Sequence, residues 1–245
     1  MKRPPRFAIK RAAVNGDRAS VEGAELHHLR DVMRLQAGAQ VMLLDESDTL
    51  YAGRIESFGQ DHALIALSGE PDAIVVAAPL ILAVGLIKGS RMDFLVEKAA
   101  ELGATELVPL LCQRSVIRDP GAERFERWRR LAVAAVKQSL AAKRMVIHSP
   151  RSVAGLVREV SKETRAVVCS PAGLPFASVI QDTRPNALTV ACGPEGGFAQ
   201  EEMALMISAG YREVSLGANR LRTETAALAA LSIAIGVRAE FAARG

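Results

Sequence analysis

Two glycine-rich loops near the C-terminus constrain the fold of this chain more than any other feature. Each follows a short apolar run typical of a buried strand, residues 187–192 for the first loop and 214–216 for the second, and each precedes a helix-like run. In open α/β sheets, ligands bind at the carboxyl ends of parallel strands, where glycines let backbone groups approach without a Cβ atom in the way. The pattern predicts a pocket for a nucleotide-like ligand.

The residues of the loops exclude two familiar pockets. The first loop is Gly193-Pro194-Glu195-Gly196-Gly197-Phe198, and the second runs from Gly217 to Thr225. Neither has the lysine and hydroxyl of a phosphate-binding loop or the Gly-x-Gly-x-x-Gly pattern of a dinucleotide site, which argues against a pyrophosphate ligand and a nicotinamide oxidoreductase. One such run could be a plain turn. Two of them, with one helix and one strand between them, favour a pocket.

The rest of the chain has two styles of patterning. Up to about residue 70 the runs are short and strand-like, with one helical piece at 24–34, which predicts a small β-barrel with strands at 7–10, 18–22, 40–45, 50–58 and 62–67. From Leu80 onward strands alternate with helices, which predicts a parallel sheet covered on both faces, with strands at 80–87, 106–111, 145–148, 166–170, 187–192 and 214–216. The final helix, from Thr223 to about residue 241, is apolar nearly all round, so we expect it to be buried on several sides, either in a core or against a second copy. We place the linker at residues 69–72 and expect domains at 1–70 and 71–245.

Length and composition predict a cytoplasmic protein that folds alone. The chain has 245 residues, 49% of them hydrophobic and 24% charged, and no apolar stretch reaches the roughly 20 residues that a membrane-spanning helix needs. We expect no signal peptide and no membrane partner. The three cysteines Cys112, Cys169 and Cys192 lie far apart in apolar runs, which suits reduced core residues. Histidine and cysteine spacing predicts no metal site.

Positive charge is concentrated in two segments. Residues 114–151 hold ten lysines and arginines against three acidic residues, and the first 11 residues hold five basic side chains and no acid. Clustered basic side chains are the electrostatic signature of phosphate-backbone binding, although a solvated helix face would show the same pattern. Our candidates for binding a nucleic-acid backbone are Arg3, Arg6, Arg11, Arg114, Arg127 and Arg130.

The two loops together resemble the signature of the ribosomal RNA small-subunit methyltransferase E family, in the SPOUT superfamily. Gly193 to Phe198 match one half of it, and Leu216-Gly217 with Leu221-Arg222-Thr223-Glu224-Thr225-Ala226 match the other. The resemblance extends over the whole chain, through Lys88-Gly89 with Arg91-Met92-Asp93 and through His27-His28-Leu29-Arg30. The segment Leu140–Arg144 departs from the family pattern, which leaves the RNA contacts of that loop open.

The resemblance implies a fold and a ligand that the patterning alone does not. It implies a C-terminal SPOUT α/β domain with a deep trefoil knot, an exception to the rule of unknotted chains, and a small N-terminal PUA-like β-barrel domain. It also implies a homodimer that methylates N3 of one uridine of 16S rRNA, with the RNA in the small ribosomal subunit. S-adenosylmethionine would be held by Gly193, Pro194, Glu195, Gly196, Gly197, Leu216, Gly217, Leu221, Arg222 and Thr225.

The residue types fit methyl transfer to a uridine. The imide N3 of uridine is a poor nucleophile until its proton leaves, and Arg222 is our candidate to stabilise the negative charge that then spreads onto the carbonyl oxygens. Glu195 is the candidate proton acceptor, with fixation of its own loop as an equal alternative. We expect Glu224 to serve the positive end of its helix and Thr223 to be the N-cap.

Two other functions share part of the pattern. A SPOUT ribose 2′-O-methyltransferase acting on rRNA or tRNA would have the same knot, but such proteins carry a Ser-Leu-Asn-Val-Ser-like segment in place of residues 223–227. A non-catalytic RNA-binding ribosome-assembly factor would need the basic segments and not the loops. Nucleoside analysis of the product distinguishes the ribose methyltransferase from the uridine-N3 methyltransferase. Failure to bind S-adenosylmethionine would favour the non-catalytic protein.

Overall fold

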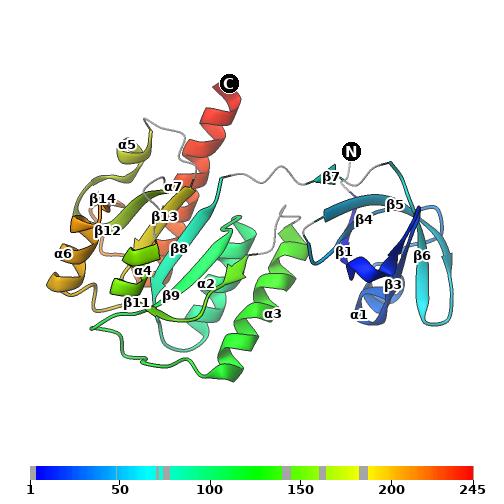
Figure 1. Cartoon of the computed structure of the whole chain (residues 1–245), viewed down its shortest axis with the longest axis horizontal. Coiled ribbons are helices and arrows are strands. Elements are labelled where there is room, and N and C mark those ends of the chain that lie inside the picture. The colour runs from blue at the N-terminus through cyan, green and yellow to red at the C-terminus, as the bar shows by residue number, and fades with distance from the viewer. Residues whose placement is uncertain are drawn as a thin grey trace. The chain divides into compact units, whose positions relative to one another are not determined.

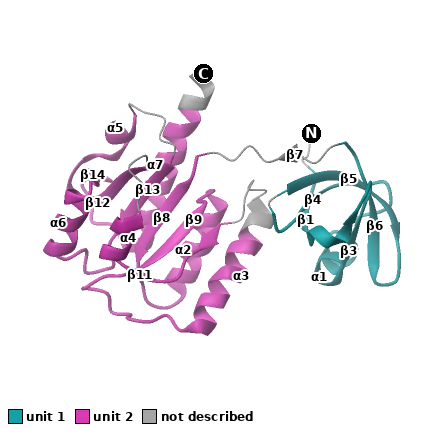
Figure 2. Ribbon diagram, in the orientation of Figure 1, with its two compact units in different colours: residues 1–76 teal, residues 77–245 magenta. Residues whose placement is uncertain are grey.

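The computed structural model of the chain describes residues 4–47, 49–69, 72–73, 78–139, 145–159, 164–181 and 187–244. The chain divides into two compact units, residues 1–76 and 77–245 (Figure 2). The short strand β7 (Asp72–Ala73) pairs with β5 (Thr49–Phe58) and thus belongs to the first unit. Our sequence-based boundary lies just before this strand.

The first unit is a curled, mostly antiparallel sheet with a short helical segment. Its strands are ordered β1-β4-β5-β6-β3-β2, with β7 beside β5, and only the β1–β4 pair is parallel. The further elements are β1 (Arg6–Ala8), a 3-10 turn (Arg11–Ala13), β2 (Val14–Asn15), β3 (Arg18–Glu22), α1 (Gly23–His27), β4 (Gln40–Leu44) and β6 (His62–Leu67). The five strands expected from the sequence are present, with small shifts at their ends. The helix expected at 24–34 is present as α1 and a π-helical turn, His28–Val32, that continues it.

Alternating side chains explain why this sheet closes around a core. Along β5, Tyr51 and Ile55 are buried, whereas Arg54 and Glu56, on either side of Ile55, are exposed, because successive residues of a strand point to opposite faces. The buried side chains of all the longer strands meet those of the helical segment in one cluster that includes Phe7, Leu29, Leu43, Ile55 and Ile65.

The second unit is a parallel sheet ordered β10-β9-β8-β13-β12-β14, with β11 beside β9 (Figure 1). The strands are β8 (Leu80–Gly85), β9 (Glu106–Leu111), β10 (Val146–Ile147), β11 (Arg151–Ser152), β12 (Thr164–Pro175), β13 (Ala187–Cys192) and β14 (Arg212–Ser215). The chain leaves β8 toward β9 and leaves β13 toward β14. The crossovers therefore diverge between the adjacent strands β8 and β13, the kind of position where open sheets bind ligands.

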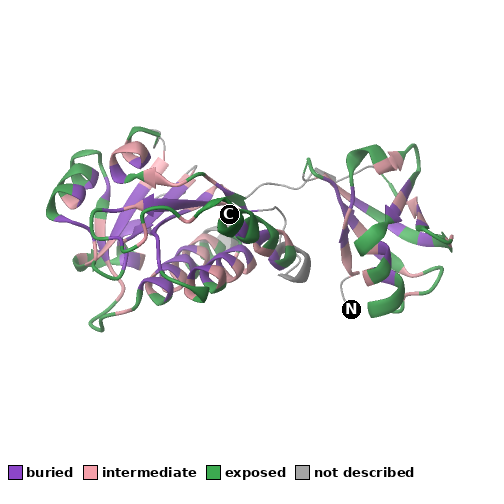
Figure 3. Cartoon of the chain, turned by 90° about the horizontal axis from the view of Figure 1, so that it is seen from below, coloured by how far each residue is buried: buried purple, intermediate pink, exposed green. Residues whose placement is uncertain are grey.

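Helices cover both faces of this sheet. They are α2 (Ser90–Glu101), α3 (Ala122–Ser139), α4 (Val153–Glu159), α5 (Phe176–Ile180), α6 (Gln200–Ser208) and α7 (Thr223–Arg244). On one face α2 packs against α3 and α7, and α7 also contacts α5, β8 and β13. On the other face α4 packs beside α6, and Leu156 and Met206 meet the strand residues Val108, Val168 and Ala191. Burial is greatest in the strands and on the inward sides of the helices (Figure 3).

Two elements differ from the sequence-based expectation. We expected a strand at 166–170, whereas β12 continues to Pro175. Its pairing with β14 shifts between Cys169 and Leu174, both of which lie opposite Val214, so the intervening residues bulge out of the ladder. We also expected α7 to be buried on several sides, either in a core or against a second copy. The core of this chain buries one stripe, formed by Ala227, Ala230, Leu231 and Ala234, so burial of the other sides against a second copy stays a prediction.

No helix within the described residues is long and apolar enough to span a membrane. The segment Leu140–Arg144, where the chain departs from the family pattern, lies outside the described residues, as does Arg3.

Candidate active site

The two glycine-rich loops enclose one side of a cavity at the carboxyl ends of β12, β13 and β14. Its volume is about 1240 Å³, above the roughly 300–1,000 Å³ typical of small-molecule sites. Nine of the ten candidate cofactor-binding residues line it, namely Gly193, Pro194, Glu195, Gly196, Gly197, Leu216, Gly217, Leu221 and Arg222. The tenth, Thr225, is exposed on the first turn of α7 and does not line the cavity, whereas Thr223 and Ala226 do. The cavity can hold a nucleoside-sized ligand with space left over.

The first loop runs against the end of β8. A Cβ atom added to Gly85 would lie 2.4 Å from the backbone nitrogen of Pro194, so the loop can take this position only beside a glycine. The loop then turns, with the N–H of Gly197 donating to the carbonyl of Pro194 at 2.8 Å. Gly85 is a site residue that sequence reasoning missed.

The second loop delivers Arg222 to the cavity. Gly217 has a φ of 115°, in the range that favours glycine, where the chain turns out of β14. The carbonyl of Arg222 accepts the N–H of Ala226 at 2.8 Å, so Arg222 is the N-cap of α7 and its side chain is exposed at the cavity. Thr223, which we expected at the N-cap, is the first helical residue and is buried.

Arg91 links carboxylates from both loops. Its guanidinium lies 3.1 Å from the Glu195 carboxylate and 4.0 Å from that of Glu224. Glu224 is buried in the first turn of α7, where the helix dipole also favours its charge. Arg91, in the first turn of α2, is thus a second residue that was not among our candidates. The Lys-Gly-x-Arg-Met-Asp pattern quoted for the family resemblance contains it.

The turn that follows β9 supports the first loop from the other side. Arg114 donates from its guanidinium to the carbonyl of Gly196 at 3.2 Å, so this RNA-binding candidate lies beside the cofactor loop. Glu202, near the start of α6, accepts the N–H of Gln113 at 2.8 Å and that of Ala199 at 2.9 Å. Its carboxylate is buried, and nothing in the sequence distinguishes it from its exposed neighbour Glu201.

The three cysteines are free thiols, as the sequence predicts. Cys112 and Cys192 are buried, whereas Cys169 is half-buried. Burial, with the charge of Glu202 as a second cause, raises the pKa of Cys112 to about 12. The thiols of Cys169 and Cys192 both line the cavity, with their sulfur atoms 3.5 Å apart, and this hydrogen bond, together with burial, raises the pKa of Cys192.

The remaining RNA-binding candidates lie on both units. On α3, Arg127 and Arg130 are exposed, and Arg127 donates to the carboxylate of Asp93 at 2.8 Å. In the first unit, Arg6 is half-buried in β1 and Arg11 is exposed at the start of the 3-10 turn. Arg114, Arg127 and Arg130 therefore belong to the unit with the cavity, and Arg6 and Arg11 to the other.

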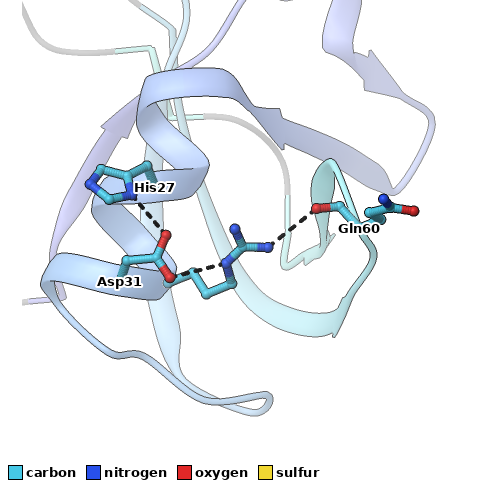
Figure 4. Close-up of polar contacts among 4 residues, drawn as sticks. His27, Asp31 and Gln60 are labelled. Carbon is cyan, nitrogen blue, oxygen red and sulfur yellow. Dashed lines mark hydrogen bonds and ion pairs between the residues drawn. The ribbon is translucent and has the colours of Figure 1, made fainter.

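An exposed polar cluster follows α1 in the first unit (Figure 4). His27 lies 2.8 Å from Asp31, and Arg30 donates to Asp31 at 3.2 Å and to the carbonyl of Gln60 at 3.2 Å. The hydrogen bonds from Arg30 and His27 lower the pKa of Asp31. These contacts hold the Arg30 guanidinium in a fixed orientation at the surface.

Among the described residues, no group of three or more histidine, cysteine, aspartate or glutamate side chains is arranged to hold a metal ion.

Two families of domains match the two parts of the chain. Residues 76–235 match the RNA methyltransferase domain, and residues 21–67 match the RNA methyltransferase PUA domain. The chain is 33% identical, over 216 residues, to the ribosomal RNA small subunit methyltransferase E of Synechocystis, a match that covers 85% of this chain and 70% of the relative.

Solved structures have the same fold. A Legionella pneumophila protein in complex with the bound cofactor S-adenosylmethionine is 26% identical, with a TM-score of 0.80 and coverage of 98% of both chains. The ribosomal RNA small subunit methyltransferase E of Neisseria gonorrhoeae, solved bound to S-adenosylmethionine, is 24% identical, with a TM-score of 0.80 and coverage of 94% of this chain and 96% of that one. At that identity the second comparison supports the fold alone.

Proposed function

Because this chain belongs to the ribosomal RNA small subunit methyltransferase E family, we propose that it methylates N3 of one uridine of 16S rRNA with S-adenosylmethionine. The observation that carries the proposal is the single cavity that both glycine-rich loops line, with Arg222 exposed at it.

The cavity fits the cofactor. Backbone groups of the glycine-rich loops are open to a ligand, and Met203, Ile207 and Leu216 offer apolar surface for an adenine ring. The volume of about 1240 Å³ leaves room for a nucleobase beside the cofactor. S-adenosylmethionine supplies an electrophilic methyl group on its sulfonium, so the protein must orient the acceptor and help to remove its proton.

Arg222 stabilises the acceptor in this proposal. When the N3 proton of uracil leaves, the electron pair spreads over N3 and the two neighbouring carbonyl oxygens. A guanidinium directed at one of these oxygens stabilises that anion, as donors do in an oxyanion hole. Because Arg222 is the N-cap of α7, its backbone position is fixed by the helix while its side chain extends from it.

Glu195 accepts the N3 proton. It lines the cavity, and the contact with Arg91 at 3.1 Å orients its carboxylate. The N3–H bond breaks, and its proton passes to the Glu195 oxygen and then to water. The electron pair left on N3 forms the bond to the methyl carbon as the S–CH3 bond breaks, and the pair of that bond stays on the sulfur of the thioether that leaves, S-adenosylhomocysteine. If Glu195 only braces its loop, Glu195→Gln will weaken cofactor binding and leave the rate from the bound complex unchanged.

The proposal includes RNA contacts, self-association and location. The exposed Arg11, Arg114, Arg127 and Arg130 bind phosphates of the RNA, together with Arg3 and Arg6.

Half-buried apolar side chains beside the buried stripe of α7, such as Leu228 and Ile233, support a homodimer through this helix. The substrate is 16S rRNA within the small ribosomal subunit, in the cytoplasm.

A trefoil knot is part of the proposed fold. After β14, at one edge of the sheet, the chain returns through the second loop so that α7 contacts β13 and β8 in the middle. This return path supports a chain that threads between the two glycine-rich loops.

The test combines product analysis with one variant. Small subunits that lack methylation at the site are incubated with the protein and labelled S-adenosylmethionine, and the nucleosides are separated by mass spectrometry. We expect 3-methyluridine. A product with 2′-O-methyluridine would favour the ribose methyltransferase, and absence of cofactor binding would favour a non-catalytic assembly factor.

Arg222→Ala tests the catalytic assignment in the same assay. We expect nearly unchanged affinity for cofactor and RNA and a single-turnover rate lower by about 10²-fold, the effect of removing an oxyanion donor. A normal rate from the bound complex would contradict the role of Arg222.

A further inference from the structure

Glu202 is a buried carboxylate to which the proposed function gives no role. It is 7% exposed, in the first turn of α6, and its two oxygens accept different backbone N–H groups. One accepts Ala199 at 2.9 Å and the other accepts Gln113, in a distant part of the chain, at 2.8 Å. A buried charge is costly unless hydrogen bonds hold it, so this carboxylate joins its two partners firmly.

Both partners belong to segments that contact the first glycine-rich loop. Ala199 directly follows the loop, so its bond to Glu202 fixes the position where the loop ends. Gln113 lies in the turn 112–115 after β9, which is closed by the N–H of Ser115 donating to the carbonyl of Cys112 at 3.0 Å.

The same turn reaches the middle of the loop. Arg114 donates to the carbonyl of Gly196 at 3.2 Å, and the backbone of the two residues is close enough that a Cβ on Gly196 would lie 3.1 Å from the Cβ of Arg114. A path of direct contacts therefore runs from Glu202 through Gln113 and Arg114 to Gly196. The carboxylate of Glu202 thus bonds directly to the residue at the end of the loop and, through the turn that carries Arg114, is connected to its centre.

We propose that Glu202 is a positioning residue, which holds the loop Gly193–Phe198 ready for S-adenosylmethionine through Ala199 and through the turn that carries Arg114. The proposal rests on the proposed function, because it requires that this loop binds the cofactor. A loop that is ordered before binding loses less conformational freedom when the ligand arrives, so positioning raises affinity. Glu202 itself touches neither cofactor nor RNA.

The first experiment measures cofactor affinity by calorimetry in folded variants. Glu202→Ala removes both acceptors, and Glu202→Gln keeps one carbonyl oxygen in nearly the same volume. We expect dissociation constants for S-adenosylmethionine about tenfold higher for the alanine variant and intermediate for the glutamine variant. Glu201→Ala, one residue away and exposed, is the matched control and should bind as the wild type does.

A double-mutant cycle separates positioning from simple helix capping. If Glu202 acts through the turn, Arg114→Ala and Glu202→Ala disrupt the same path. The affinity of the double variant for S-adenosylmethionine should then be almost the same as that of the single variant with the lower affinity. The cycle of Arg114→Ala with Glu201→Ala should be additive. If the losses of S-adenosylmethionine affinity in the two single variants instead multiply in the double variant, Glu202 acts only as a cap of α6, and the proposal is overturned.

The outcomes also distinguish this proposal from the function on which it rests. Wild-type protein that fails to bind S-adenosylmethionine would overturn the proposed function itself. Wild-type binding and methylation together with wild-type affinity in folded Glu202→Gln and Glu202→Ala would overturn only the role of Glu202. If the alanine variant does not fold, the nearly isosteric glutamine variant decides.

Discussion

Gly85 ends β8 in contact with the backbone of Pro194, and this contact leaves no space for a side chain. A Cβ atom there would meet the nitrogen of Pro194 at 2.4 Å and its Cδ at 2.6 Å, and both belong to a rigid ring and main chain that cannot rotate away. The loop would have to move as a unit.

We therefore expect Gly85→Ala to weaken S-adenosylmethionine binding by tenfold or more and to cost about 1–3 kcal/mol of stability, as overpacking does. Calorimetry and urea unfolding measure the two effects. Gly155→Ala is the control, since its Cβ would meet nothing closer than 3.5 Å. Wild-type affinity in Gly85→Ala would mean that the loop moves freely and that its position does not matter for the cofactor.

Cys112 provides a test of burial beside the site. A thiol reacts as its thiolate, and with a pKa of about 12 in the native protein, against about 8.5 in an unfolded chain, Cys112 stays protonated at pH 8.5. Between these two pKa values the unfolded state releases a proton that the native state keeps, so this group destabilises the fold progressively as the pH rises. The effect fades below about pH 8, where the thiol of the unfolded chain becomes protonated as well.

In the native protein at pH 8.5, we expect a maleimide to label the half-buried Cys169 first and to leave Cys112 unmodified. Peptide mapping by mass spectrometry identifies the labelled thiol, and unfolding in urea should make all three cysteines reactive. Rapid labelling of Cys112 in the folded protein would show that the turn after β9 opens readily. That result would also weaken the role assigned to its neighbours.

Sequence reasoning identified the residues of the loops and missed those that hold them. Gly193 to Gly197 are recognisable because the pattern is local and recurs at a strand end. Gly85 and Glu202 are functional through partners far away in the chain, Pro194 and Gln113, and only the folded sheet brings these together. Neither an isolated glycine at the end of an apolar run nor the second of two adjacent glutamates carries a signal of its own.

Among the elements, α2 and α3 pack against each other and share a polar contact at Asp93 of α2. Asp93 accepts the indole N–H of Trp128 at 2.9 Å and a guanidinium N–H of Arg127 at 2.8 Å. Trp128 is among the largest fully buried side chains, so its N–H has no access to water and depends on this acceptor.

We expect Asp93→Ala to cost about 1–3 kcal/mol in urea unfolding, because the buried indole N–H is left without a partner. Arg127→Ala removes only an exposed ion pair and should cost less than about 1 kcal/mol. The comparison isolates the buried bond from the surface charge. Equal small effects of both variants would mean that water replaces the carboxylate at Trp128.

The elements themselves were largely predictable, and their exceptions have physical causes. The strands at 106–111 and 187–192 have the expected bounds because a strand covered on both faces must be apolar throughout. The extension of β12 to Pro175 was not foreseen, because residues 170–173 leave the ladder. Cys169 before them and Leu174 after them both pair with Val214 of β14, and no local pattern in the sequence indicates this shift in register. The sequence also does not reveal which stripe of α7 the core buries, because alanine-rich helices show little polarity between their faces.

At the scale of the whole molecule, the basic residues divide between those that add charge to the surface and those whose charge is already paired. Arg129 and Arg130 are adjacent on α3 and both exposed. The guanidinium of Arg129 lies 2.6 Å from the Glu126 carboxylate and 4.6 Å from the centre of the Phe125 ring. Its charge is therefore compensated within the helix, whereas Arg130 is our candidate contact to a phosphate.

The two arginines should consequently differ in the salt dependence of RNA binding. Each phosphate that the protein neutralises releases condensed counterions and adds about 0.7–0.9 to the slope of log K against log salt concentration. We expect Arg130→Ala to weaken binding of 16S rRNA and to reduce that slope by about one unit, and Arg129→Ala to change it by less. Binding is measured by filter retention or fluorescence anisotropy at four or more salt concentrations, with cofactor affinity as the check on folding. If the slope is unchanged in Arg130→Ala, Arg130 does not contact the RNA backbone, and its charge only keeps this face of α3 solvated.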